Sequence, residues 1–188
     1  PRPDEFQIKE AAEKIKASKN PIIISGGGVF YSDAMEELSK FAIKHNIPVT
    51  QTVMGYSTMK RDHSHYAGQI GALGGKNTNS LAKQTDLAIA VGTKLADFTT
   101  GSWTNFENEN FKLVSINVSR FDANKHLAQA VVGDARASLN ELSAALGDWK
   151  APDGWNKKSQ IELKAWNEHV DKESAPTNQE VPSYVQVV

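Results

Sequence analysis

The stretch Pro21-Ile22-Ile23-Ile24-Ser25-Gly26-Gly27-Gly28 decides the fold of this chain. Its three consecutive isoleucines are typical of a short strand that is buried on both faces. The three glycines let the backbone turn sharply and leave no side chain in the way of a ligand. Because a helical pattern follows, the stretch predicts the first βα unit of an α/β protein, with a crevice at the carboxyl end of a parallel sheet.

Further strand and helix patterns alternate along the chain. We expect strands at residues 48–52, 65–70, 87–91, 112–117 and 130–132. We expect helices at residues 4–18, 33–46, 77–85, 134–146 and 159–172, with Asp33 and Glu36 spaced as in a capping box. This alternation predicts an α/β fold, a doubly wound, Rossmann-like parallel sheet of about six strands with helices on both faces.

The composition changes after Leu146 and suggests a second unit. Residues 148–154 contain the proline and glycine typical of a linker, and residues 175–182 suggest a second linker. We therefore expect a central domain over residues 1–147 and, over residues 148–188, a linker with one helix. Because the chain begins at Pro1 and ends at Val188 without a terminal cap, we also expect it to be part of a longer protein.

The bulk composition excludes several classes of function. The chain has 188 residues, 21 Lys and Arg against 22 Asp and Glu, and a formal net charge of −1. This balance offers no basic footprint for nucleic acid or for an anionic membrane. The sequence holds no cysteine, which excludes disulfides and thiolate chemistry. We see no signal peptide and no apolar run long enough to span a bilayer, and we expect a cytoplasmic protein.

The glycine turn is the first candidate binding site. Gly26 and Gly28 begin a dinucleotide-binding fingerprint, but Tyr31 stands where its third small residue belongs. The second expected strand ends in Thr50-Gln51-Thr52, without the acidic residue that would hold a ribose. Two interpretations stay open: the glycines turn a tight corner, or they let a phosphate or cofactor approach.

His63 and His65 form the second candidate site. They lie in a charged loop beside Asp62 and could serve as metal ligands or as a base. No further ligand has a spacing suited to a metal, so we favour a solvated loop. We find no nucleophile elbow, Walker loop or kinase signature, and we assign no catalytic residue and no metal ligand.

The order of the glycine turns resembles the central domain of thiamine-diphosphate-dependent enzymes such as acetolactate synthase and pyruvate oxidase. The segments that carry this resemblance are residues 21–28, 46–49, 54–55, 71–75, 86–92, 112–117 and 132–134. Three further segments, residues 27–32, 97–103 and 117–126, resemble the trihydroxycyclohexane-1,2-dione hydrolases of myo-inositol catabolism. Together the resemblance covers residues 5 to 147.

The resemblance implies a middle domain without catalytic residues of its own. In the family an N-terminal domain carries the glutamate that activates thiamine, and a C-terminal domain carries a Gly-Asp-Gly…Asn-Asn segment for magnesium and diphosphate. Here Gly133-Asp134-Ala135 and Gly147-Asp148-Trp149 lack that pattern, whereas residues 181–188 resemble the start of the C-terminal domain. Thiamine diphosphate and Mg²⁺ would therefore be bound by the missing domains, and the isolated chain would be inactive.

The whole enzyme would hydrolyse a carbon–carbon bond of a cyclic diketone. Its partners would be the missing N- and C-terminal domains and further copies in a homo-oligomer, a dimer or tetramer. Two alternatives stay open from the resemblance: the middle domain of an acetolactate synthase-like carboligase, and a module that binds an ADP- or FAD-type nucleotide. A third, purely structural reading is a spacer that packs the catalytic domains together.

Flavin-binding relatives hold FAD in this domain, and the sequence departs from them at three positions. Asn117 ends the strand where an acidic residue would hold the adenosine ribose, and Lys94 and Phe98 replace two arginines. Because lysine does not replace arginine at a bidentate phosphate contact, we expect weak or no FAD binding. As residues that line the crevice and could contact a cofactor or ligand we assign Gly26, Gly27, Gly28, Gly74 and Trp103.

Overall fold

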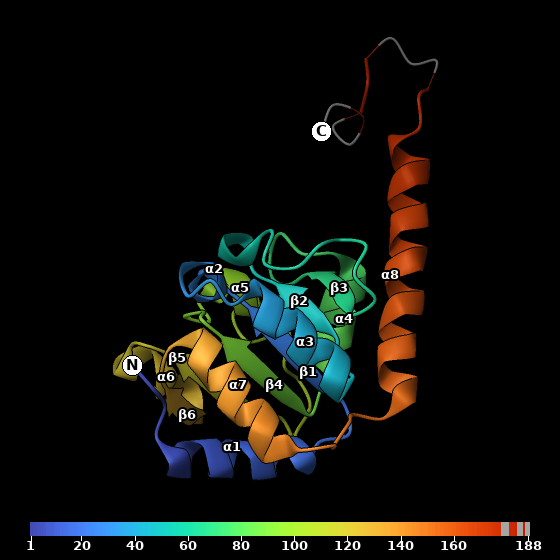
Figure 1. Ribbon diagram of the computed structural model, residues 1–188. Coiled ribbons are helices and arrows are strands. Elements are labelled where there is room, and N and C mark those ends of the chain that lie inside the picture. The colour runs from blue at the N-terminus through green and yellow to red at the C-terminus, as the bar shows by residue number, and fades with distance from the viewer. Residues whose placement is uncertain (178–180, 184–185, 187–188) are drawn as a thin grey trace.

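Six parallel strands form one sheet in the order β3-β2-β1-β4-β5-β6 (Figure 1). The computed structural model describes residues 1–177, 181–183 and 186. The strands are β1 (Pro21–Ser25), β2 (Val49–Gln51), β3 (Tyr66–Gln69), β4 (Leu87–Val91), β5 (Lys112–Asn117) and β6 (Gln129–Val132). The expected doubly wound α/β fold is confirmed, and the strand order reverses between β1 and β4, which is where such folds place their ligand crevice.

Helices cover both faces of the sheet. One face carries α1 (Glu5–Lys16), α3 (Met35–His45) and α7 (Ala135–Leu146), and the other carries α4 (Lys76–Gln84) and the base of α8 (Asp153–Ser174). Short helical turns follow the strands: α2 (Gly27–Tyr31), η1 (Val53–Gly55), α5 (Asp97–Thr100), α6 (Arg120–Ala123) and η2 (Lys125–Leu127).

The isoleucines of β1 supply the centre of both cores. Successive side chains of a strand point to opposite faces. Ile23 therefore joins the core under α1, α3 and α7, whereas Ile22 and Ile24 join the core under α4 and α8. All three are fully buried, as the apolar run in the sequence predicts.

The glycine turn after β1 packs directly on the turn after β4. A Cβ atom at Gly28 would lie 2.6 Å from Cα of Gly92, and one at Gly26 would lie 2.5 Å from the carbonyl oxygen of Gly92. The N–H of Gly28 donates to that same carbonyl at 2.9 Å. The two backbones can approach this closely only because neither turn carries side chains at these positions, so Gly26 and Gly28 serve packing between chain segments.

Glutamine side chains from two helices cover the outer edges of the sheet. At the β3 edge, Nε2 of Gln160 on α8 donates to the carbonyl of Tyr66 at 2.9 Å. At the β6 edge, Oε1 of Gln7 on α1 accepts from the N–H of Val132 at 2.9 Å. Unpaired edge groups invite pairing with another chain, and these amides occupy them.

The helix α8 begins within the residues that we expected to be a linker. It starts at Asp153, and its first turn buries Trp155 in the core beside Ile22 and Ile24. The indole Nε1 of Trp155 donates to the carbonyl of Pro21 at 2.8 Å, which ties the base of α8 to β1. Farther along, α8 rises beyond the sheet (Figure 1). The second expected linker, 175–182, and the tail at 181–188 lie partly outside the described residues.

The expected capping box at Asp33 is wrong. Asp33 adopts a left-handed conformation with φ of 50°, and α3 begins after Ala34. Instead, the carboxylate of Asp33 lies 3.6 Å from Arg136 on α7, whose guanidinium also pairs with Glu37 at 2.8 Å. A tertiary contact between α3 and α7 therefore takes the place of the local cap.

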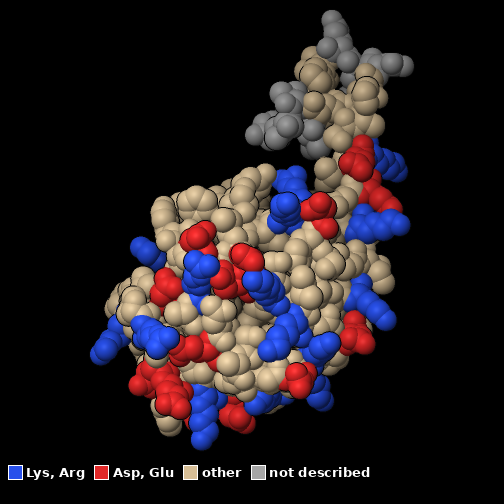
Figure 2. All heavy atoms as spheres, in the orientation of Figure 1, with Lys and Arg blue, Asp and Glu red and all other residues tan. Residues whose placement is uncertain are grey.

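Charges of both signs are interspersed over the visible face of the molecule (Figure 2). The upper edge of the body, near α2, carries few charged side chains in the same view. Among the described residues, no helix combines the length and the apolar character that a membrane span requires.

We predict that Gly28→Ala destabilises the fold. The added Cβ would overlap backbone atoms of Gly92, which cannot rotate away, so we expect a loss of about 1–3 kcal/mol in the free energy of unfolding. Gly154→Ala is the matched control, because a Cβ there meets nothing within 4 Å and alanine favours the helix by about 0.5–1 kcal/mol. Denaturant unfolding measures both; equal stabilities of the two variants would contradict the packing role of Gly28.

We predict that Trp155→Phe and Trp155→Ala separate two contributions of the base of α8. Phenylalanine keeps most of the apolar contact but loses the bond to Pro21, so we expect a loss of about 1 kcal/mol. Alanine also leaves a cavity, and we expect a loss of about 3–5 kcal/mol. Thermal or denaturant unfolding of the two variants tests this, and an alanine variant as stable as the original would mean that α8 does not share the core.

Candidate functional site

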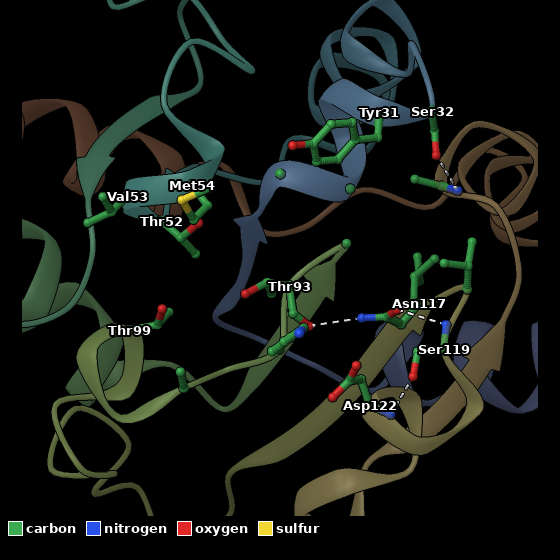
Figure 3. A pocket seen from close by; sticks show the side chains of 18 of the residues that line it. Tyr31, Ser32, Thr52, Val53, Met54, Thr93, Thr99, Asn117, Ser119 and Asp122 are labelled. Carbon is green, nitrogen blue, oxygen red and sulfur yellow. Dashed lines mark hydrogen bonds between the residues drawn. The ribbon is translucent and has the colours of Figure 1, made fainter.

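A cavity of about 960 Å³ opens at the carboxyl edge of the sheet (Figure 3). Turns that follow all six strands line it, and the turn after β3 contributes Leu73. Because the strand order reverses between β1 and β4, the cavity lies at the topological switch point, where α/β proteins bind ligands. The crevice expected from the sequence is therefore present at this edge.

The structure separates the three glycines of the first turn. Gly27 and Gly28 line the cavity. Gly26 is absent from the lining and packs against Gly92 and Thr93 instead. A Cβ at Gly27 would lie 3.1 Å from the carbonyl oxygen of Met54, so this glycine lets η1 come close to α2.

Two other candidates lie away from this cavity. Gly74 lines a separate cavity of about 520 Å³ between the end of β3 and α8. Trp103 lies in an aromatic cluster, where its ring centroid is 5.6 Å from that of Phe106 and 4.3 Å from that of His126. The five residues assigned from the sequence thus fall into different environments, although their role in binding stays a prediction.

Asn117 joins two of the turns that line the cavity. Its Nδ2 donates to the carbonyl of Thr93 at 3.2 Å, and its Oδ1 accepts from the N–H of Ser119 at 2.9 Å (Figure 3). The hydroxyl of Ser119 in turn accepts from the N–H of Asp122 and caps α6. The amide is thus engaged within the protein on both sides, and an aspartate at this position could not donate to Thr93.

The two carboxylates of the lining are also engaged. Asp122 accepts from Nζ of Lys125 at 2.7 Å, and this bond holds the pKa of Asp122 below its ordinary value. Asp134 caps α7 by accepting from the N–H of Ala137 at 3.1 Å. Burial raises the pKa of Asp134, but hydrogen bonds from Ser32 and the helix backbone outweigh burial and lower it. Both groups are therefore anionic at neutral pH.

Three backbone donors of the glycine turn are engaged as well. The N–H of Gly26 donates to Val91, that of Gly28 to Gly92 and that of Val29 to Gly26. Phosphate sites in α/β folds use free N–H groups at such a turn, together with the helix that follows. Here the chain's own carbonyls occupy three of those donors, and Asp134 occupies the start of α7. Among the described residues of the lining, Lys94, which is exposed at the rim, carries the one positive side chain.

The expectation of a solvated loop agrees with the exposure of residues 60–62 but not with that of the two histidines. His65 is buried, and its Nε2 lies 3.2 Å from Oδ1 of Asn46. His63 is half-buried, with its Nε2 2.9 Å from the hydroxyl of Ser39 on α3. Within the described part of the chain, neither histidine belongs to a group of three or more His, Cys, Asp or Glu side chains that could hold a metal.

Sequence reasoning found the position of the cavity but missed most of its polar lining. Thr93, Ser119 and Asp122 were not singled out, although each follows the end of a buried strand. The rule that carboxyl ends of parallel strands meet at one edge would have found them. The bond from Asn117 to Thr93 joins two separate turns, so no local sequence pattern predicts it.

Comparison with known proteins agrees with this architecture. The thiamine pyrophosphate enzyme, central domain, family matches residues 8–142. A 3D-(3,5/4)-trihydroxycyclohexane-1,2-dione hydrolase from Clostridium perfringens (strain 13 / Type A) is 39% identical over 166 residues, which cover 88% of this chain and 26% of the relative. The same-named protein of Geobacillus thermodenitrificans (strain NG80-2) is 39% identical over 171 residues, which cover 91% and 26% of the two chains.

A third relative agrees with these two. The 3D-(3,5/4)-trihydroxycyclohexane-1,2-dione hydrolase of Bacillus cereus (strain AH820) is 42% identical over 140 residues, or 74% of this chain and 22% of the relative. The chain thus spans about a quarter of the length of these curated relatives. The family match runs from α1 to α7 and includes all six strands. The chain therefore belongs to the thiamine pyrophosphate enzyme central domain family.

Proposed function

We propose that this chain is the central domain of a thiamine-diphosphate-dependent hydrolase that opens the ring of a trihydroxycyclohexane-1,2-dione. The observation that carries the proposal is the identity of 39–42% to hydrolases of that name over most of the chain. These relatives favour the hydrolase over the acetolactate synthase-like carboligase. Since the match covers about a quarter of each relative, the remaining three quarters would supply the reaction centre.

The residues of this chain do not fit thiamine diphosphate and Mg²⁺. Magnesium is bound through carboxylates and phosphate oxygens. In the described residues the carboxylates at the cavity are committed to Lys125 and to the start of α7. We therefore assign no step of the reaction to this chain and propose that both groups bind to other domains of a longer polypeptide.

We predict that the isolated chain has no hydrolase activity. Incubation with thiamine diphosphate, Mg²⁺ and the cyclic dione should leave the dione unchanged, because the chain contributes no proton-transfer group to a reacting centre. A chimera of the Clostridium perfringens relative, with its matching segment replaced by residues 8–142, should open the ring. The same chimera should not form acetolactate from pyruvate. Turnover by the isolated chain would contradict the proposal.

The exposed apolar residues around the cavity support contacts with flanking domains. Tyr31, Met54, Leu73, Phe98 and Val118 all line the cavity, and all are more than half exposed. Apolar residues gathered in this way are typical of interaction surfaces. We propose that the neighbouring domains cover this edge and that the assembly is a cytoplasmic homo-oligomer, a dimer or tetramer.

The cavity favours a second candidate function, the binding of a nucleotide-type ligand. Its volume of about 960 Å³ and its place at the switch point suit such a molecule. Because donors of the glycine turn are already engaged, they are not available to bind the diphosphate. Because Asn117 bonds to Thr93, it is not available to bind the adenosine ribose. We therefore propose that any flavin binds without help from its diphosphate.

We predict that FAD binds this chain no more tightly than riboflavin. The two ligands share the isoalloxazine ring, so the ratio of their dissociation constants isolates the contribution of the diphosphate and adenosine. The double variant Lys94→Arg, Phe98→Arg should tighten FAD binding by about tenfold or more, because one charge-assisted hydrogen bond contributes about 1.5–3 kcal/mol. Riboflavin is the matched control and should bind as before. Quenching of flavin fluorescence measures both, and a lower dissociation constant for FAD than for riboflavin with the unaltered chain would contradict the prediction.

A further inference from the structure

Two histidines join the loop before β3 to the helix α3. Nε2 of His63 lies 2.9 Å from the hydroxyl of Ser39 on α3, and Nδ1 of His63 accepts the backbone N–H of His65 at 3.1 Å. His65 continues the chain of contacts, with its Nε2 3.2 Å from Oδ1 of Asn46 and its Nδ1 3.0 Å from the hydroxyl of Ser64. The two rings lie 5.8 Å apart.

The partners of His63 require a neutral ring. A backbone N–H can only donate, so Nδ1 of His63 must carry a lone pair. The proton of the neutral ring then sits on Nε2 and is donated to Ser39. An imidazolium carries protons on both nitrogens and has no acceptor to offer His65. His65 differs, because the hydroxyl of Ser64 can turn and accept from a protonated Nδ1.

The same segment holds the lower half of α8. Nδ2 of Asn156 donates to the carbonyl of Ser64 at 3.4 Å, and Nε2 of Gln160 donates to the carbonyl of Tyr66 at 2.9 Å. Asn46 extends the connection to the start of α8, since its Nδ2 lies 3.2 Å from both the carbonyl of Ala151 and Oδ1 of Asp153. The attachment of α8 to the body thus runs in part through residues 63–66.

We propose that His63 forms a pH-sensitive latch. While its ring is neutral, it holds residues 60–65 against α3. When the ring is protonated, these residues are released and the attachment of α8 to the body is weakened. We expect the residues before this segment, toward the cavity at the carboxyl edge of the sheet, to stay in place. Thr58 is fixed 2.6 Å from the hydroxyl of Ser25, and the carbonyl of Met59 accepts from Gln51 at 2.9 Å. Opening therefore stops at residue 60.

Burial of His63 sets the direction of the effect, and the charged groups around it modify it. Its own loop presents Arg61, Asp62 and His65, while α3 meets it through the uncharged hydroxyl of Ser39. From α8, Lys164, Glu168 and Asp171 line a cavity of about 360 Å³ together with His63. Burial lowers the pKa of His63 below its ordinary value of 6.5, and the charge of Asp62 offsets this only in part.

The pH window follows from that direction. The latched form prefers the neutral ring and the released form takes up the proton more readily, so lowering the pH favours release. The latch is at full strength above pH 6.5 and weakens as the pH falls below that value. The equilibrium between the two forms shifts by up to about tenfold for each unit by which the pKa is lowered.

Amide hydrogen exchange of the chain between pH 7.5 and 5 tests the latch. After correction for intrinsic exchange rates, the protection of residues 61–66 should fall as the pH drops below 6.5, while that of β4 stays constant. In His63→Asn the carboxamide oxygen can still accept from His65 but does not titrate, so the protection should depend less on pH. The remaining dependence would come from His65, whose pKa burial also lowers. The matched control His169→Asn alters a histidine exposed on α8 and should behave like the original chain.

Nitrogen NMR of the imidazoles gives a second, independent readout. His63 should show the neutral form with its proton on Nε2 at pH 7.5. A proton on Nδ1 at that pH, protection of residues 61–66 that does not vary with pH, or an unchanged pH dependence in His63→Asn would each overturn the proposal.

Discussion

The contact between the glycine turn after β1 and the turn after β4 governs the rest of this structure. Both turns leave the sheet at the point where the strand order reverses, so their backbones must pass close to each other. Gly26, Gly28 and Gly92 allow the backbones to touch, and the hydrogen bond from Gly28 to Gly92 fixes their spacing. The cavity opens beyond this contact, so part of its lining belongs to closely packed main chain in which Gly26, Gly28 and Val29 already donate hydrogen bonds.

This arrangement separates two uses of glycine that look identical in a sequence. A glycine-rich turn after a buried strand suggests that a ligand approaches the backbone closely. In this protein another part of the same chain makes that approach: the turn after β4 packs against Gly26 and Gly28, and η1 packs against Gly27. The fingerprint pointed the same way, because Tyr31 replaces its third small residue and no acidic residue follows the second strand to hold a ribose.

Features set by local patterns could be predicted from the sequence. The run Ile22–Ile24 gave β1, and Asp134 after a strand correctly indicated the start of α7. Features set by distant partners could not. Asp33 is a residue type that commonly caps helices, but its carboxylate faces Arg136. His63 lies in a polar stretch, but its ring contacts the hydroxyl of Ser39. Trp155 lies in a segment rich in Pro and Gly, yet its ring completes the core beneath β1.

The amides of Gln7 and Gln160 have a consequence for the outer strands of the sheet. Each occupies one backbone group, the N–H of Val132 on β6 and the carbonyl of Tyr66 on β3. A further strand could pair with either group only after displacing the glutamine from it. The two side chains therefore make extension of the sheet less favourable at these two positions.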